Sequence, residues 1–412
     1  MKNKIFLLMI TLLLCIGIYG YSNFTKNSKP VNQYNKRSTT VKNTNKENDS
    51  NLTYGIKLDD NTRDITSSVI DKDSNIKFIH NFDKDKMIIA SDVSIASDKN
   101  KKVNVKIFNL SSGKTEKQLE IKLKNPVYNF MPLNKGFYII DGNTMKRDET
   151  TFYHIYDNEL KLEKTVDLSN LVRNVGYKSY ILSNNGDKIA YIDDTDSKIS
   201  SIYICNLDLK NRRKVYEVEN NKVNNLANFD DIVFAENDKK IAFIGKIYIN
   251  GNNWPQAFGT VNINGEEFNY KKHDGVSNII QVSRGKTFFS DAETERGKDS
   301  SGQVFLEDNI LNNVEEYSLK DKAESKSAYI SDWGNFIVTC LGGKCQNNEP
   351  IYRFRIYDSK SKNIIKEMDT VFKEKDFLRC HIQEISICEE RNSIYVAYKG
   401  DKEIKLYQYK LY

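Results

Sequence analysis

Residues 182–219 read LSNNGDKIAYIDDTDSKISSIYICNLDLKNRRKVYEVE and form one unit of a repeat. In this unit a polar turn containing Gly186 runs directly into the apolar strand IAYI, and two further strand-like segments follow. Similar turns recur along the chain, each followed by β-branched or aromatic residues, which suit a packed pleated surface. The strands after the turns begin at Met87, Phe137, Ile189, Ile241, Thr287, Phe336 and Ile394, with spacings of 50, 52, 52, 46, 49 and 58 residues. A steady period of this length is typical of an architecture built from repeated units.

Each repeat supplies four strands. An apolar segment precedes the turn, and the third strand, IYICNL in the unit above, alternates with the period of two that indicates a sheet with two different faces. The fourth strand is more charged, as in KVYEVE, which suits an outer edge. Four antiparallel strands repeated around an axis make a β-propeller, so the sequence predicts an all-β, seven-bladed propeller of four-stranded antiparallel blades. A pair of β-sandwiches or a large open sheet is the alternative.

The last repeat ends after its third strand, because the chain stops at Tyr412. Its blade therefore needs a fourth strand from elsewhere. The segment 52–70, LTYGIKLDDNTRDITSSVI, precedes the first complete unit and has the composition of a strand. We expect this N-terminal segment to close the ring by pairing with the C-terminal blade at residues 404–409.

The unit at 182–219 resembles the repeat of the propeller in the TolB family, S-x-D-G-x-x-I-A-Y followed by I-Y-x-x-x-L. Propellers attached to prolyl-oligopeptidase-like peptidases share this repeat. The matching positions are Ser183, Asn184, Asn185, Gly186, Ile189, Ala190, Tyr191, Ile202, Tyr203 and Leu207, with Asn185 in place of the family's Asp. The resemblance is recognisable again at 237–243 and faint in the other units. It implies a propeller and no catalytic residues, since the chemistry of the peptidase relatives lies on a separate hydrolase domain that this chain is expected to lack.

The N-terminal 51 residues differ in composition from the repeats. Lys2 and Lys4 precede 17 uncharged residues, from Ile5 to Tyr21, so residues 1–21 are interpreted as an export signal or membrane anchor. The positive-inside rule then places the rest of the chain outside the cytoplasm, or secretes it if the signal is cleaved. Residues 22–51 are rich in Asn, Lys, Ser and Thr and predict a disordered linker. Residues 52–412 form the propeller domain.

The net charge of the protein comes from the N-terminal part of the chain. The first 50 residues have eight Lys or Arg and two Asp or Glu, a net charge of +6 that equals the net charge of the whole protein. The predicted propeller is therefore neutral, and no basic cluster indicates a nucleic-acid partner. The basic linker is best read as a solvated spacer, with contact to anionic lipid or cell-wall polymer as the alternative.

The cysteines allow one specific hypothesis. Cys340 and Cys345 flank a Gly-Gly segment, and if this segment is a hairpin loop the two thiols could form a disulfide. Free thiols are the alternative reading, because spacing alone does not determine pairing. A zinc site made of Cys340, Cys345, Cys380 and His381 does not match the spacing of structural zinc sites.

Local catalytic signatures are absent from the sequence: it has no H-E-x-x-H, G-x-S-x-G, C-x-x-C or G-x-G-x-x-G, and no cofactor site is predicted. Function in a propeller concentrates on the loops that join second to third strands. The loop at 245–257 contains Tyr248 and Trp254, and the loop at 291–302 contains Arg296. We expect these three side chains to form a ligand or partner surface, because Trp and Arg often anchor interfaces. Packing of Trp254 against its own blade is the alternative.

These observations favour a monomeric, membrane-anchored, extracytoplasmic module that binds a protein or a cell-surface ligand without catalysing a reaction. The alternative is a propeller enzyme of the lyase or glycosidase type, whose acidic, His or Tyr residues come from different blades and leave no local motif. Convergence of carboxylates with perturbed pKa values near the axis would favour the enzyme.

Overall fold

The structure is a computed structural model. The chain divides into two units, Met1–Thr53 and Tyr54–Tyr412. The described residues belong to the larger unit and are 62–66, 74–93, 101–125, 128–142, 150–171, 180–220, 223–249, 255–272, 278–283, 286–290, 302–307, 315–319, 325–331, 334–344, 350–359, 361, 363–371, 381–400 and 404–411.

The described part of the larger unit is an all-β propeller of four-stranded antiparallel sheets. Six sheets each contain four strands that are consecutive in the chain. They are β2 (Ser74–Asp83), β3 (Lys86–Val93), β4 (Lys101–Asn109) and β5 (Lys114–Leu123); β6 (Tyr128–Leu133), β7 (Gly136–Asp141), β8 (Phe152–Tyr156) and β9 (Leu162–Asp167); β10 (Tyr180–Leu182), β11 (Lys188–Asp193), β12 (Ile199–Asn206) and β13 (Arg213–Glu219); β14 (Leu226–Ala235), β15 (Lys240–Ile247), β16 (Gln256–Asn262) and β17 (Asn269–Lys272); β18 (Asn278–Ser283), β19 (Lys286–Ser290), β20 (Gly302–Glu307) and β21 (Glu315–Leu319); and β22 (Ser325–Ile330), β23 (Phe336–Lys344), β24 (Pro350–Asp358) and β25 (Ile364–Val371).

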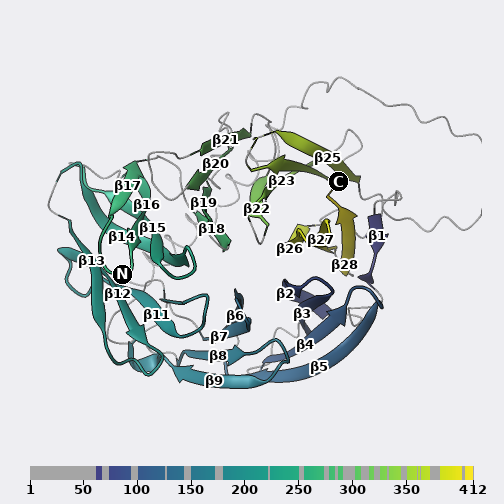
Figure 1. Ribbon diagram of the computed structural model, residues 1–412, viewed down its shortest axis with the longest axis horizontal. Helices are drawn as coiled ribbons and strands as arrows, with labels where there is room; N and C mark the ends of the chain where they lie inside the picture. Colours follow the sequence, from purple (N-terminus) through teal and green to yellow (C-terminus); the bar gives the residue numbers. More distant parts are fainter. Residues whose placement is uncertain are drawn as a thin grey trace, which may run out of the picture. The chain divides into compact units, whose positions relative to one another are not determined.

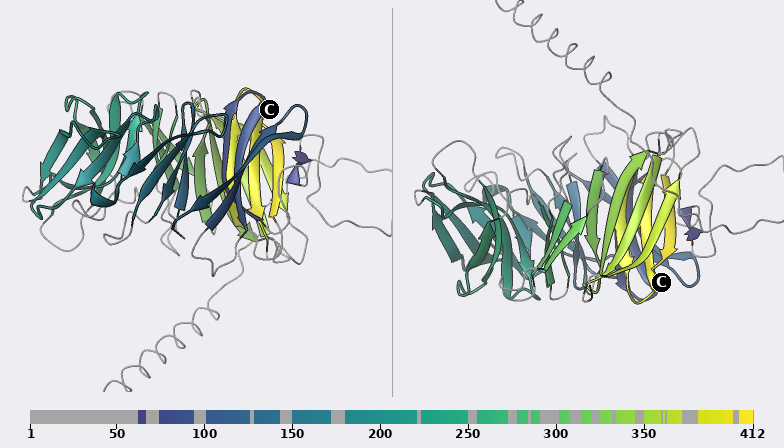
Figure 2. Two further views of the ribbon diagram at one scale, coloured as in Figure 1. Left: turned by 90° about the horizontal axis from the view of Figure 1, so that it is seen from below. Right: turned by 90° about the horizontal axis from the view of Figure 1, so that it is seen from above.

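A further four-stranded sheet joins the two ends of the unit. It has the order β1 (Thr62–Asp64), β28 (Ile404–Lys410), β27 (Ser393–Lys399) and β26 (His381–Cys388). Figure 1 shows the sheets around a common axis, with β2, β6, β18, β22 and β26 on the inner side and β5, β9, β21 and β25 at the rim. The edge-on views show strands that run across the thickness of the ring, so the hairpin turns lie on its two opposite faces (Figure 2).

The expectation of seven like blades, the last closed by segment 52–70, needs correction. Among the described residues, six sheets are built from four consecutive strands, whereas the last sheet has three consecutive strands and β1. The strand that the N-terminal side adds has three residues, pairing with Tyr407–Tyr409. Ile65 follows this strand, is 3% exposed, and packs among the apolar residues between this sheet and the β2–β5 sheet. The added strand is therefore much shorter than the predicted segment, and one buried side chain supplements its backbone pairing.

The predicted second strands are confirmed. The seven observed strands β3, β7, β11, β15, β19, β23 and β27 each begin within one residue of the predicted start. The turn before β11 has a clear physical basis: Ser183 Oγ accepts hydrogen bonds from the backbone of Asp187 and Lys188 at 3.1 and 3.0 Å, and Gly186 takes a φ of +73°. The positive φ suits glycine, which has no Cβ to clash.

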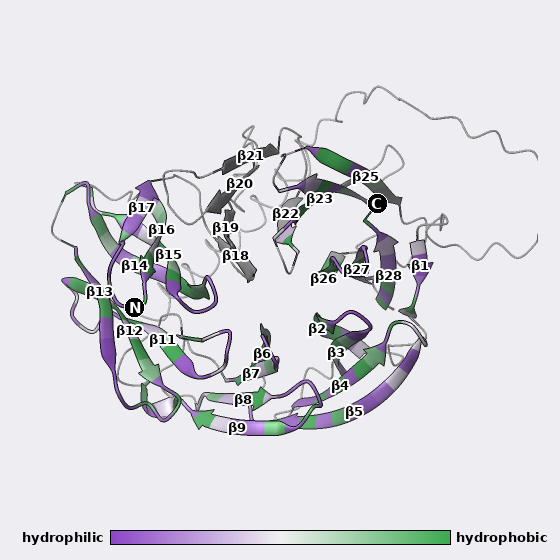
Figure 3. Ribbon diagram, viewed as in Figure 1, coloured by the Kyte–Doolittle hydropathy of each residue, from purple (hydrophilic) through white to green (hydrophobic). Residues whose placement is uncertain are grey.

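The core lies between neighbouring sheets. The apolar cluster between the β10–β13 and β14–β17 sheets, for example, contains Ile202, Phe229 and Phe243, each with no exposed surface. Outer strands are more polar: β5 is exposed along most of its length, with buried residues only near its end, and Figure 3 shows hydrophilic residues along it. Burial thus falls from the inner strands to the rim, as the charge of the fourth strands predicts.

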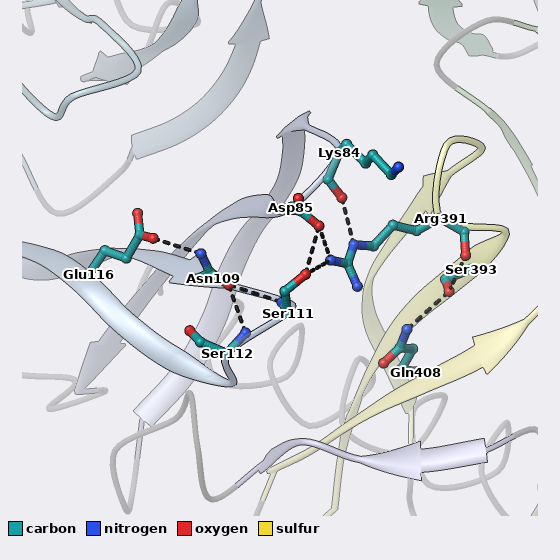
Figure 4. A network of polar contacts seen from close by, with 9 residues as sticks. All are labelled: Lys84, Asp85, Asn109, Ser111, Ser112, Glu116, Arg391, Ser393 and Gln408. Atoms are coloured by element: carbon teal, nitrogen blue, oxygen red, sulfur yellow. Dashed lines mark hydrogen bonds and ion pairs between the residues drawn. The ribbon is translucent and has the colours of Figure 1, made fainter.

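Contacts between turns join successive sheets on one face of the ring. Arg391, in the turn between β26 and β27, donates to the carbonyl of Lys84 at 2.6 Å and to Ser111 Oγ at 2.5 Å, and it pairs with Asp85 (Figure 4). The acceptors belong to turns of the β2–β5 sheet. These contacts connect the last sheet of the chain to the first.

The same turn also reaches in the other direction. Glu389 accepts hydrogen bonds from Ser331 Oγ and from Asn335 Nδ2, the latter at 2.7 Å, in the turn between β22 and β23. Between other sheets, Asp238 accepts from the backbone N–H groups of Asn184 and Asn185 at 2.7 and 2.9 Å. Polar turn residues therefore connect adjacent sheets at several seams of the ring.

Candidate functional site

Charged and polar residues lie on or beside the inner strands β26, β2 and β6, which belong to three neighbouring sheets of the ring. We call Lys77, Asp92, Tyr128 and Glu384 the inner-strand cluster. Lys77 belongs to β2, Asp92 to β3, Tyr128 begins β6, and Glu384 belongs to β26. In the antiparallel order all four lie toward the face that carries the loops between second and third strands. The sequence predicted the functional surface on that face.

Bulges in two strands shape this cluster. The register of β2 against β3 shifts between Ile76 and Phe78, so Lys77 is an extra residue in β2. A shift between Ile382 and Glu384 makes Gln383 an extra residue in β26. A bulge bends its strand and redirects the neighbouring side chains, and bulges are frequent next to functional sites.

Lys77 lies beside a buried carboxylate. Its Nζ is 3.8 Å from Asp92 Oδ1, and the Lys77 side chain is 38% exposed whereas that of Asp92 is 5% exposed. The Tyr128 hydroxyl donates a hydrogen bond to the other oxygen, Asp92 Oδ2. Burial and this hydrogen bond raise the pKa of Tyr128, so the hydroxyl remains a donor. Asp92 Oδ1 is buried and has no hydrogen-bond partner among the described residues.

Glu384 is the second carboxylate of the cluster and comes from the opposite end of the chain. Burial raises the pKa of Glu384 to about 7, and the positive charge of Lys77 opposes this effect. Within the described ranges, no hydrogen bond or salt bridge reaches the Glu384 carboxylate. A carboxyl group with this pKa changes its charge near neutral pH, which an ordinary glutamate does not do.

Two hydrogen bonds fix β26 against β2. Gln383 Oε1 accepts from the backbone N–H of Ile76 at 3.2 Å, and Asn81 Nδ2 donates to Ser386 Oγ at 2.7 Å. Ser386 and Glu384 share one face of β26, because side chains alternate along a strand. The contact between Ser386 and Asn81 therefore places Glu384 on the side of β26 that faces the sheet of Lys77.

The cluster can act as a set of alternating hydrogen-bonding groups. Lys77 supplies donors and lies 3.8 Å from Asp92, its charge also acts on Glu384, and among the described residues no donor pairs with Asp92 Oδ1 or with the Glu384 carboxylate. No group of three or more His, Cys, Asp or Glu suited to a metal ion occurs in the part of the chain that the structure describes.

A second polar group lies across β7, β8 and β9. Asp141 has no exposed side-chain surface and is 3.2 Å from His154 Nε2, and His154 Nδ1 is 3.0 Å from Thr165 Oγ1. The backbone N–H groups of Lys124 and Asn125 also donate to Asp141, each at 2.9 Å. Burial opposes ionisation, but these hydrogen bonds outweigh it and lower the pKa of Asp141. The group anchors the segment after β5, and we interpret it as structural.

The structure places one of the three predicted binding residues. Tyr248 follows β15 and is half-buried, and its backbone pairs with Asn224 and Asn225 at 2.7 and 3.0 Å. Trp254 and Arg296 lie outside the described residues. Tyr248 belongs to a sheet that contributes nothing to the inner-strand cluster, so the predicted surface and this cluster are separate candidates.

The predicted hairpin between Cys340 and Cys345 needs correction. β23 continues to Lys344, and Gly342 and Gly343 pair with Tyr352 and Ile351 inside the sheet. Cys340 is a free, buried thiol whose strand partner is Phe354. Cys345 lies outside the described residues. The Gly-Gly segment is therefore strand, and the geometric reason for a disulfide is gone.

Sequence reasoning missed the inner-strand cluster. One local signal was present: Glu384 interrupts the apolar run of HIQEISIC, and Lys77 interrupts that of SNIKFIHNF. A charged residue within an inner strand is costly to bury unless it is paired or used.

Neither the family models nor the curated proteins contain a match to this chain. Among solved structures, acylaminoacyl peptidase from Pyrococcus horikoshii is 16% identical, with a TM-score of 0.42, over 66% of this chain and 42% of that one. The β-propeller domain of the trilobed protease from Pyrococcus furiosus is 14% identical, with a TM-score of 0.37, over 83% and 82% of the two chains. An oligogalacturonate lyase in complex with manganese is 12% identical, with a TM-score of 0.50, over 87% and 96%.

The protein thus spans less than half of the peptidase's length. At these identities the similarity concerns the fold alone. The resemblance to the TolB family stays a prediction, and the chain is established as a β-propeller by its topology.

Proposed function

We propose that the protein is an extracytoplasmic binding module, held at the membrane by residues 1–21 and displayed as a monomer through the linker 22–51. The anchor is supported by the uncharged segment from Ile5 to Tyr21 and by the lysines before it. No helix among the described residues is long and apolar enough to cross a membrane. The ligand is a protein or a component of the cell surface.

One observation carries the proposal that this module binds a ligand. Glu384, in the inner strand β26, has no hydrogen-bond partner among the described residues, and Lys77, in the inner strand β2 of the adjacent sheet, has a side chain that is 38% exposed. Carboxylates that are partly withdrawn from water without hydrogen-bond donors destabilise the fold. A ligand that supplies the donors offsets this cost, which is a reason for such a cluster to exist.

The test has two parts. First, protease treatment of intact cells should degrade the propeller while a cytoplasmic control protein survives, and resistance to the protease would contradict the proposed location. Second, full-length wild-type protein and the Lys77→Met variant should be compared for retention by isolated cell-surface fractions. Equal retention of both proteins would contradict the assignment of the binding site.

An enzyme is the second candidate, and the raised pKa of Glu384 favours it. A carboxyl group with a pKa of about 7 suits a general acid or base at neutral pH. A lyase or glycosidase reaction would place Glu384 next to the transferred proton. Glu384→Gln should then abolish turnover of a bound substrate while leaving its affinity within a few fold. A variant that keeps full turnover would exclude this role.

The loops with Tyr248, Trp254 and Arg296 form a separate proposed contact surface. Trp254→Ala should reduce partner recovery while leaving the melting temperature unchanged. A large loss of stability instead would mean that Trp254 packs against its own blade.

A further inference from the structure

A series of hydrogen bonds crosses β7, β8 and β9 and ends at an exposed threonine. Asp141 Oδ2 is 3.2 Å from His154 Nε2, and His154 Nδ1 is 3.0 Å from Thr165 Oγ1. His154 on β8 and Thr165 on the outer strand β9 lie directly opposite each other in the register. Burial falls along the series: the Asp141 side chain is fully buried, that of His154 is 15% exposed, and Thr165 is exposed.

The two ends of this series have different roles. Asp141 holds the segment after β5, because it accepts hydrogen bonds from the backbone N–H groups of Lys124 and Asn125. The hydrogen bond between His154 and Thr165 takes no part in that anchor. The exposed end of the series therefore needs a separate explanation.

The positions of the protons follow from the hydrogen bonds. Burial opposes the ionisation of Asp141, but its hydrogen bonds lower its pKa, so the carboxylate is ionised at neutral pH and only accepts. His154 Nε2 must then carry a hydrogen, and in the neutral imidazole Nδ1 is an acceptor. The Thr165 hydroxyl is therefore the donor to Nδ1. Phe152 stacks on the imidazole, with ring centroids 6.1 Å apart, and helps to hold its orientation.

We propose that Thr165 is an acylation site whose hydroxyl takes an acyl group from an activated ester, with His154 as the general base. Thr165 Oγ1 attacks the carbonyl carbon of the ester while His154 Nδ1 removes the hydroxyl proton. The bond from the carbonyl carbon to the leaving oxygen then breaks, and the imidazolium gives its proton to that oxygen. The products are acyl-Thr165 and an alcohol or phenol, and His154 is neutral again.

Asp141 is a positioning residue in this step. It fixes the tautomer of His154, and its negative charge stabilises the imidazolium that forms when the Thr165 proton is transferred. A nucleophile in contact with a base that a third group orients is the arrangement that activates hydroxyl groups in proteins. General-base assistance of this kind accelerates a reaction by about 100-fold to 10,000-fold.

Mass-spectrometric mapping of the full-length protein in detergent, after exposure to 4-nitrophenyl acetate, tests this inference. Thr115 is the internal reference, because it is exposed on the outer strand β5 and its strand partner, Phe108, has no basic nitrogen. We expect Thr165 to be acetylated about 100-fold faster than Thr115 in the wild type. Hydroxylamine should remove the acetyl group from Thr165 and leave acetylated lysines unchanged, because it cleaves esters and not amides.

Variants separate the roles of the three residues. Thr165→Ser should keep acetylation at this position, whereas Thr165→Val, which has the same shape without the hydroxyl, should lose it. His154→Gln should lower acetylation of Thr165 to the rate at Thr115, and Asp141→Asn should also slow it. All rates are measured below the melting transition of each variant, so the ratio of Thr165 to Thr115 acetylation reports activation of the hydroxyl and not unfolding.

Equal rates at Thr165 and Thr115 in the wild type would overturn the inference, and this comparison requires no variant to fold. Undiminished acetylation of Thr165 in folded His154→Gln would overturn the role of His154. The site shares no residue with the inner-strand cluster and goes beyond the proposed binding function. Retention of Lys77→Met by cell-surface fractions tests that function separately.

Discussion

Replacement of Glu384 by glutamine should stabilise the folded protein at alkaline pH. In the unfolded chain this carboxyl group titrates near 4.5, whereas burial raises its pKa to about 7 in the folded state. Between these two values the folded state holds a proton that the unfolded state has lost. The stability contributed by the protonated group is therefore fully present below pH 4.5, declines as the pH rises, and is absent above pH 7.

The size of the effect follows from the two pKa values. A rise from 4.5 to about 7 corresponds to about 3 kcal/mol, which is an upper limit because Glu384 is only partly buried and solvent screens its charge. Glutamine carries no charge at any pH, so the variant lacks this penalty. The difference in unfolding free energy, variant minus wild type, should increase by about 2–3 kcal/mol between pH 4.5 and pH 8.

Urea unfolding at several pH values measures this difference directly. Comparison of one variant with itself across pH removes any constant effect of the amide group on packing. Glu390→Gln, at an exposed position in the turn after β26, is the matched control and should parallel the wild type. Wild-type and Glu384→Gln curves that stay parallel from pH 4.5 to pH 8, or a gap that closes as the pH rises, would contradict the raised pKa of Glu384.

Three further changes probe the ring. Arg391→Ala removes the hydrogen bond to the carbonyl of Lys84 and should lower the unfolding free energy by about 1–2 kcal/mol in urea titrations. Arg355→Ala, which removes an ion pair with Glu367 between two outer strands, should cost less. Equal losses would contradict a special role for Arg391 in joining the last sheet to the first. Gly136→Ala should destabilise the protein by more than about 2 kcal/mol, because φ is +122° and the new Cβ would lie 1.9 Å from a backbone oxygen. Gly186→Ala should cost about 1 kcal/mol, because φ is +73° but the new Cβ would have no contact under 3.4 Å. Thermal melts of both variants measure the difference. Equal decreases in melting temperature for Gly136→Ala and Gly186→Ala would contradict the close backbone contact at Gly136. Asp141→Asn should remove stability that is present above pH 3.8 and is lost as the pH falls through the lowered pKa of Asp141, so the variant should show a flatter acid limb in pH-dependent unfolding.

The positions of the strands could be predicted because they depend on local patterns. Ser183 and Gly186 determine a turn through bonds within six residues, and the apolar residues after them determine the strand. The error at Gly342 and Gly343 has a similar local origin. Two glycines favour a turn, but the pairing of both residues with β24 extends the strand through them.

The inner-strand cluster could not be predicted in this way. Lys77 and Glu384 are about 300 residues apart in the sequence, and they meet only because the last sheet lies beside the first. The bulges at Lys77 and Gln383 also depend on pairing with the neighbouring strand. The sequence shows only that Lys77 and Glu384 each interrupt an apolar strand, and this does not indicate that the two residues lie close together.

The pairing of β1 with β28 sets the order in which the protein can fold. Thr62 and Tyr409 are about 350 residues apart, so the first strand leaves the ribosome long before its partner exists. Closing so long a loop carries an entropic cost, and Ile65, buried directly after the three-residue strand, adds apolar contacts to the backbone pairing. Strands that are neighbours in the sequence can pair first, so we expect the pairing of β1 with β28 to be among the last contacts to form.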